Sequence, residues 1–74
     1  MTSAQVRAAR GLLNWTVRML AEKAGVHRNT ITNIETGKYN GDADTLDAIR
    51  KAFEAAGVEF IEKNGGGPGV RLKE

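Results

Sequence analysis

Four side chains between positions 28 and 33 have the chemistry to read the edges of DNA base pairs. They share the outward face of one predicted helix, and they are Arg28, Asn29, Thr32 and Asn33. Arginine pairs with guanine, asparagine pairs with adenine, and the threonine methyl can contact thymine. Asparagine and threonine form helices poorly, and an ordinary exposed helix favours Glu, Lys, Ala and Gln. These side chains therefore indicate a binding face, although Asn29 and Thr30 could instead help to cap the start of the helix.

Catalytic and metal-binding chemistry has little support in the sequence. The chain has one histidine, His27, and no cysteine. Three aspartates (Asp42, Asp44 and Asp47) cluster at a predicted helix start, where carboxylates cap free amides and oppose the helix dipole. His27 has no second histidine three or four positions away that would complete a metal site. We therefore expect no enzymatic activity, no metal and no cofactor.

Helices are needed to position the polar face, and the apolar spacing predicts four of them. The first follows a cap at Ser3 and ends at Asn14, and its apolar residues recur at helical spacing: Val6, Ala9, Leu12 and Leu13. The fourth starts at Asp42 or Asp44 and ends before Gly57, and its apolar stripe consists of Leu46, Ile49, Ala52 and Phe53. The pattern indicates a mainly α fold.

The second and third helices are separated by a sharp turn. Thr16 is a suitable N-cap for the second helix, and Gly25 can adopt the positive φ that ends it. A third helix over about 27–36 follows and is terminated by Gly37. The apolar side chains spaced to seal this pair against the rest of the domain are Leu20, Val26, Ile31 and Ile34. Many helical hairpins share these features, so the turn alone does not establish nucleic-acid binding.

After position 57 the apolar period changes from helical to alternating. VEFIE and VRLK alternate apolar and polar residues around KNGGGPG, which predicts a short C-terminal β-hairpin over 58–74. A lone hairpin is marginal in water, so its apolar residues need cover; they are Val58, Phe60, Val70 and Leu72. They could fold back on the helices, or an open strand edge could pair with a second chain. We favour the homodimer, because the core of so short a chain is small.

Charge is divided unevenly along the chain. Residues 1–40 carry six basic and two acidic side chains, whereas residues 41–74 carry five basic and seven acidic ones. A basic front half suits a polyanionic partner, although such asymmetry also occurs on surfaces that have no target. Seventy-four residues predict one domain, 1–74. With neither a membrane-length apolar run nor a signal-like N-terminus, we expect a cytoplasmic protein with no membrane partner.

Residues 16–38 resemble a known family. Their order, T-x-x-x-LAEKAGV-x-x-x-TI-x-x-IE-x-GK, is similar to the helix-turn-helix of the lambda-repressor-like family, also called the XRE or Cro/repressor family. The resemblance covers about residues 3–57. It implies a four-helix DNA-binding core over 3–57, followed by the hairpin at 58–74 as a possible dimerisation element. The implied function is sequence-specific binding of double-stranded DNA by a small transcriptional regulator, with the third helix in the major groove.

The resemblance also assigns roles to individual residues. It places Arg28, Asn29, Thr32 and Asn33 against the bases, and it places six residues near the phosphates: Thr16, Val17, His27, Thr30, Lys38 and Asn40. It implies that Arg10 and Glu35 form an ion pair between the first and third helices. Two positions depart from the family pattern, because Val17 replaces the usual Gln and His27 replaces a Ser or Thr cap. These changes affect the clamp on DNA rather than the fold.

A second interpretation stays open, namely a protein-interaction or antitoxin-like module with weak or non-specific DNA binding. Such proteins normally carry a disordered or partner-binding tail, whereas the residues after the fourth helix have the alternation of an ordered hairpin. No small-molecule effector site is evident in the sequence. The two interpretations differ in whether Phe60 and Leu72 are covered by a second copy or by a foreign protein.

Overall fold

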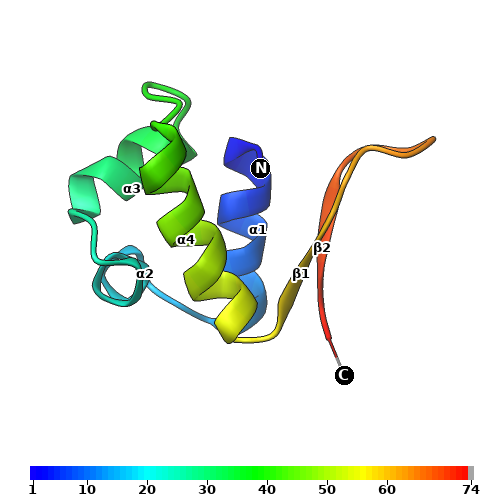
Figure 1. Cartoon of the computed structure of the whole chain (residues 1–74), viewed down its shortest axis with the longest axis horizontal. Coiled ribbons are helices and arrows are strands. Elements are labelled where there is room, and N and C mark those ends of the chain that lie inside the picture. Colours follow the sequence, from blue (N-terminus) through cyan, green and yellow to red (C-terminus); the bar gives the residue numbers. More distant parts are fainter. Residues whose placement is uncertain (74) are drawn as a thin grey trace.

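A computed structural model describes residues 1–73 and shows four helices followed by a two-stranded antiparallel sheet. In chain order the elements are α1 (Ser3–Leu13), α2 (Val17–Ala24), α3 (Arg28–Glu35), α4 (Ala43–Ala55), β1 (Val58–Ile61) and β2 (Gly69–Leu72). Figure 1 shows α3 and the hairpin at opposite ends of the long axis, with α1 and α4 between them. The predicted mainly α fold with a C-terminal hairpin is confirmed.

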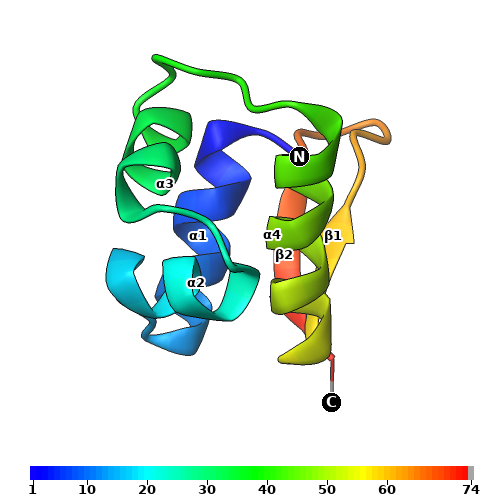
Figure 2. The same cartoon turned by 60° about the vertical axis from the view of Figure 1, so that its left-hand side comes forward.

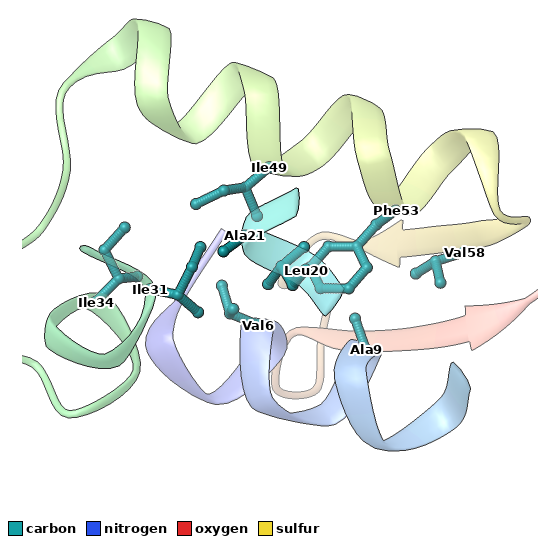
Figure 3. Packing of buried hydrophobic residues seen from close by; sticks show 9 residues of the cluster. All are labelled: Val6, Ala9, Leu20, Ala21, Ile31, Ile34, Ile49, Phe53 and Val58. Atoms are coloured by element: carbon teal, nitrogen blue, oxygen red, sulfur yellow. The ribbon is translucent and has the colours of Figure 1, made fainter. Parts of the chain in front are cut away.

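One hydrophobic core joins all four helices to the first strand (Figure 3). Its buried side chains are Val6, Ala9, Leu20, Ala21, Ile31, Ile34, Ile49, Phe53 and Val58. The ring of Trp15 stacks on that of Phe53 with 5.6 Å between centroids, and Phe53 meets Phe60 edge-on at 5.9 Å. This row of aromatic rings ties the α1–α2 turn and β1 to α4.

Local chemistry sets most of the helix ends. The side chains of Thr16, His27 and Asp42 each accept a hydrogen bond from a backbone N–H at the start of α2, α3 and α4, respectively. Asn14 and Gly25 end α1 and α2 in the left-handed conformation, with φ of 56° and 71°. These ends agree with the expected caps and stops, and Asp42 rather than Asp44 caps α4.

The first helix differs from expectation in its cap and in one apolar position. Thr2, not Ser3, is the N-cap, and it forms a capping box with Gln5. Ser3 instead uses its hydroxyl in a tertiary contact with α3. Leu12 is 42% exposed, because the buried face of α1 is formed by Gln5, Val6 and Ala9.

The hairpin folds back on the helices, with β2 against α1 and β1 against α4. In Figure 2, β2 lies behind α4 and β1 lies at the outer side of the molecule. The strands pair Val58 with Leu72, Glu59 with Arg71, Phe60 with Val70, and Ile61 with Gly69. Alternation therefore places Val58, Phe60, Val70 and Leu72 on the face toward the helices.

Cover for the hairpin comes partly from its own chain. The buried Gln5 donates from Nε2 to the carbonyls of Gly69 at 3.0 Å and Ile61 at 3.3 Å. Val58 is 1% exposed, so it is a core residue of its own chain and has no surface to offer a second copy. Phe60 and Val70 are partly buried, and Leu72 remains 42% exposed.

Candidate nucleic-acid interface

The third helix has two very different sides. Ile31 and Ile34 point into the core, where they are 0% and 3% exposed (Figure 3). The opposite side carries the four side chains with base-reading chemistry, all of them exposed: Arg28, Asn29, Thr32 and Asn33. None of the side-chain hydrogen bonds found within residues 1–73 is made by these four side chains. Their donors and acceptors are therefore free for another molecule.

An ion pair from α1 fixes the C-terminal end of α3. Arg10 donates from Nε to Glu35 Oε2 at 2.7 Å and from Nη2 to Oε1 at 2.9 Å, and Glu35 is 6% exposed. A third bond runs from Arg10 Nη1 to the carbonyl of Trp15 at 3.0 Å. The hydrogen bond to Glu35 raises the pKa of Arg10 above its usual value. These are the two residues that the family resemblance pairs, and their two-pronged contact joins α1, the α1–α2 turn and α3.

Two further α1 side chains satisfy the last carbonyls of α3. The hydroxyl of Ser3 donates to the carbonyl of Ile34 at 2.6 Å, and the guanidinium of Arg7 donates to the carbonyl of Glu35. The final carbonyls of a helix have no partner within the helix, so such contacts anchor its end. No sequence signal marked Ser3 or Arg7 for this role, because the contacts cross about thirty residues of chain.

The N-terminal end of α3 is capped by its histidine. Nδ1 of His27 accepts a hydrogen bond from the N–H of Asn29 at 3.0 Å. Accepting at Nδ1 leaves the hydrogen of the neutral imidazole on Nε2, where it can donate to an anion. His27 is thus the cap, which leaves the exposed Asn29 side chain free of the capping role considered for it.

A shallow cleft at the turn adds a basic side chain that the sequence pattern did not single out. It is lined by Arg18 and Glu22 of α2 together with His27 and Arg28. Arg18 therefore stands beside the start of α3 rather than on an unrelated surface. Its exposure and its position beside the cleft make it an additional candidate for a phosphate contact.

The remaining predicted phosphate residues flank α3 on two sides. Thr16 is exposed and its hydroxyl accepts from the N–H of Met19 at 3.0 Å, whereas Val17 and Thr30 are partly buried. After α3, the N–H of Lys38 bonds to the carbonyl of Asn33 at 2.9 Å, which fixes the backbone of the following loop. Lys38 and Asn40 are both exposed in that loop. Most of the predicted contact set thus has side-chain surface open to a ligand.

Two short helices that meet at Gly25, with the second held from behind and polar on its outer side, form a helix-turn-helix. The helix-turn-helix family model matches residues 6–60. The chain belongs to the lambda-repressor-like helix-turn-helix family. Proteins of this helix-turn-helix family are DNA-binding regulators and are generally not enzymes. The comparison with curated proteins finds no match.

Other features of this helix-turn-helix protein bear on what it can bind. Among residues 1–73, no helix is both long enough and apolar enough to cross a membrane. In the same residues, no three His, Asp or Glu side chains come together as a metal site would require.

Proposed function

We propose that this helix-turn-helix protein binds double-stranded DNA sequence-specifically as a small transcriptional regulator, with α3 in the major groove. The observation that carries the proposal is the row of exposed side chains on α3 that make no hydrogen bond within residues 1–73: Arg28, Asn29, Thr32 and Asn33. Asparagine and threonine lower the intrinsic stability of an exposed helix, so their presence favours a role in reading bases.

Phosphate contacts would supply most of the affinity and would set the register of α3 on the duplex. The proposed contacts are Thr16, Val17, His27, Thr30, Lys38 and Asn40, and the structure adds Arg18. Val17 can offer only its backbone N–H, but this group lies at the start of α2, where the helix dipole attracts phosphate. The His27 Nε2 hydrogen provides a similar donor at the start of α3.

The regulator is proposed to act as a homodimer on a two-fold symmetric site. A single eight-residue helix reads only a few base pairs, and two copies related by a two-fold axis double the site that is read. Dimerisation would also cover exposed apolar surface at Leu72 and Ile61, which are 42% and 36% exposed in the single chain.

Selection of bound sites from a random duplex DNA library, at physiological and at doubled salt, tests this function. The proposal predicts an enriched two-fold motif that survives the higher salt. Salt-sensitive binding without a motif would mean attraction to the phosphate backbone only, and it would indicate that Val17 has lost a clamp. No binding at either salt would contradict the proposal and favour the protein-interaction interpretation.

A further inference from the structure

We propose that Asn40, in the loop between α3 and α4, is a site of spontaneous deamidation, and that its conversion to aspartate or isoaspartate weakens DNA binding. The reaction consumes water, leaves a carboxylate at position 40 and releases ammonia. The consequence for DNA rests on the function proposed above, because Asn40 is one of the proposed phosphate contacts. The reaction itself depends only on the chain, so it can be tested without DNA.

The chemistry requires an asparagine followed by a residue whose backbone nitrogen is accessible. That nitrogen attacks the carbonyl carbon of the asparagine side chain, a C–N bond forms, and the side-chain nitrogen leaves as ammonia with the proton that the backbone nitrogen gives up. One water molecule then opens the resulting five-membered succinimide at either carbonyl, which yields aspartate or isoaspartate. A side chain on the following residue hinders the attack, so glycine is the most permissive neighbour.

The sequence places glycine after two of its five asparagines, Asn40 and Asn64. The other three asparagines precede larger residues, in the pairs Asn14–Trp15, Asn29–Thr30 and Asn33–Ile34. The bulk of tryptophan, threonine and isoleucine beside the attacking nitrogen disfavours ring closure. The sequence alone therefore restricts rapid deamidation to positions 40 and 64.

Hydrogen bonds separate Asn40 from the slower asparagines in the same way. The N–H of Trp15 donates to the carbonyl of Arg10 and the N–H of Thr30 donates to the carbonyl of His27, both at 3.0 Å. The hydrogen bonds found outside helices and strands in residues 1–73 include none donated by the N–H of Gly41. The nitrogen that must attack the Asn40 side chain is therefore not held by another group.

The loop leaves the Asn40 side chain open to water and fixes glycine beside it. Residues 39–42 belong to neither helix, and Asn40 is exposed (Figure 2). Gly41 has a φ of 80°, and a Cβ at this position would lie 3.1 Å from Leu46 and 3.3 Å from Ile34. A larger residue that would protect Asn40 is thus excluded by the packing of the loop on the core.

A carboxylate at position 40 would change the charge next to the recognition helix. The N–H groups of Lys38 and Tyr39 both donate to the carbonyl of Asn33, so the loop turns directly off the end of α3. Deamidation replaces an amide that can donate to a phosphate oxygen with an anion that can only accept. The loop would then hold one cation, Lys38, against two carboxylates, those of residue 40 and Asp42. Repulsion between this new charge and the phosphates weakens binding.

The second asparagine–glycine pair is a matched control at the other end of the molecule. Asn64 is exposed in the turn between β1 and β2, and a Cβ at Gly65 would meet no atom within 4 Å. Figure 1 shows the hairpin and α3 at opposite ends of the long axis. Deamidation at Asn64 should therefore proceed as well, but it should leave DNA binding unchanged.

Peptide mapping by mass spectrometry tests the modification without DNA. The purified wild-type chain, kept at neutral pH and sampled over weeks, should convert amide to acid at Asn40 and Asn64 but not at Asn14, Asn29 or Asn33. Asn40→Gln should stop conversion at position 40 and leave the rate at Asn64 unchanged, because glutamine must close a larger ring that forms more slowly. A wild-type chain that converts at Asn64 alone would overturn the assignment of Asn40.

The dissociation constant for duplex DNA, measured on the same samples, tests the consequence. Wild-type and Asn64→Gln chains should lose affinity in proportion to the acid formed at position 40, whereas Asn40→Gln should keep its own starting affinity. Freshly prepared Asn40→Asp should raise the dissociation constant about fivefold at physiological salt, and less at high salt, which screens the added charge. Equal dissociation constants for Asn40→Asp and the wild type would overturn the consequence.

Protection by duplex DNA separates the modification from the proposed function. A saturating duplex that carries the enriched site should slow conversion at Asn40 and leave the rate at Asn64 unchanged. Conversion at Asn40 in a chain that binds no duplex would support the modification site and contradict the proposed function. A chain that binds its site but converts at Asn40 equally fast with and without DNA would overturn the link between the modification and binding, and leave the function standing.

Discussion

The recognition helix and the hairpin both pack against α1, but they are held in place by different forces. The end of α3 is anchored by polar contacts from Ser3, Arg7 and Arg10 of α1. The strand β1 is instead anchored mainly by the apolar side chains of Val58 and Phe60. The outer side of α3 is the surface proposed to bind another molecule, namely DNA, whereas the helix-facing side chains of β1 are used within the chain itself.

The difference indicates how precisely each surface must be oriented. Hydrogen bonds and ion pairs are directional, so the α1 contacts fix the angle at which α3 presents its outer side. Apolar packing is not directional, and it sets the position of the hairpin less narrowly. Reading bases requires side chains that are aligned before the DNA binds, so α3 needs the more directional anchor.

Breaking the polar anchor of α3 should lower the free energy of unfolding more than any other change considered. Glu35→Ala removes one partner of a largely buried ion pair and leaves Arg10 without its carboxylate, which should lower the free energy of unfolding by about 3 kcal/mol. Urea unfolding followed by Trp15 fluorescence measures this loss. The double variant Arg10→Met, Glu35→Leu should recover much of it, because no unpaired charge remains. A loss below about 1 kcal/mol for Glu35→Ala would contradict the role of the pair as an anchor.

Shortening one apolar side chain that anchors the hairpin should lower the free energy of unfolding by somewhat less than removing Glu35. Val58→Ala opens a cavity beneath β1 and should cost about 2 kcal/mol, whereas Leu72→Ala, opposite it and 42% exposed, should cost less than about 0.5 kcal/mol. The same unfolding assay compares the two variants. Equal costs would mean that the hairpin is not held through Val58.

Two glycines in the loop after α3 differ in how close they lie to other side chains. Gly37 and Gly41 both have positive φ, at 79° and 80°, but only at Gly41 would a Cβ meet core side chains, 3.1 Å from Leu46 and 3.3 Å from Ile34. Gly41→Ala should therefore cost about 1.5 kcal/mol or more, against about 1 kcal/mol for Gly37→Ala. Thermal unfolding ranks the two variants, and the reverse order would show that the loop relaxes away from the core.

The smallest effect on stability is expected for the exposed ion pair between Glu59 and Arg71 in the hairpin. In the hairpin, the hydrogen bond from Arg71 at 2.6 Å lowers the pKa of Glu59 below its ordinary value. A lowered pKa in the folded state gives stability that is present above the ordinary value, about 4.3, and is lost as pH falls through the folded pKa.

Glu59→Gln should accordingly unfold at a slightly lower temperature than the wild type at pH 7, and the two melting temperatures should converge in acid. Measuring both at several pH values and at high salt checks this, because salt screens an exposed pair. A difference that stays constant from neutral to acid pH would mean that the ion pair contributes nothing.

Elements governed by neighbouring residues could be predicted from the sequence. Thr16, Asn14 and Gly25 set helix ends through caps and left-handed conformations that involve only a few residues of chain. The choice of Thr2 over Ser3 as a cap has a local signal that the prediction of Ser3 overlooked, because Thr2 and Gln5 have the spacing of a capping box. The contact of Ser3 with a distant carbonyl in α3 has no such signal.

Contacts between residues far apart in the chain account for the other differences between the sequence predictions and the structure. Gln5 is buried because its amide donates to two carbonyls of the hairpin, more than fifty residues away. The face of α1 that carries Gln5 therefore points inward, and Leu12 lies on an exposed face. Arg7 and Arg18 are unremarkable basic residues in the sequence, and only the fold places them beside the ends of α3. The outer face of α3, by contrast, was predictable because helical spacing alone gathers its side chains.

Base-preference profiles of two variants test most directly whether α3 reads bases while its flanks hold phosphates. Arg28→Ala should relax the preference at a single position of the enriched site, at a cost of about 1–3 kcal/mol for the preferred base. Lys38→Ala should weaken binding to all sequences about equally. It should also reduce, by about one, the slope of the logarithm of the binding constant against the logarithm of salt concentration. An Arg28→Ala variant that keeps the wild-type preference at every position would show that this face of α3 does not read bases.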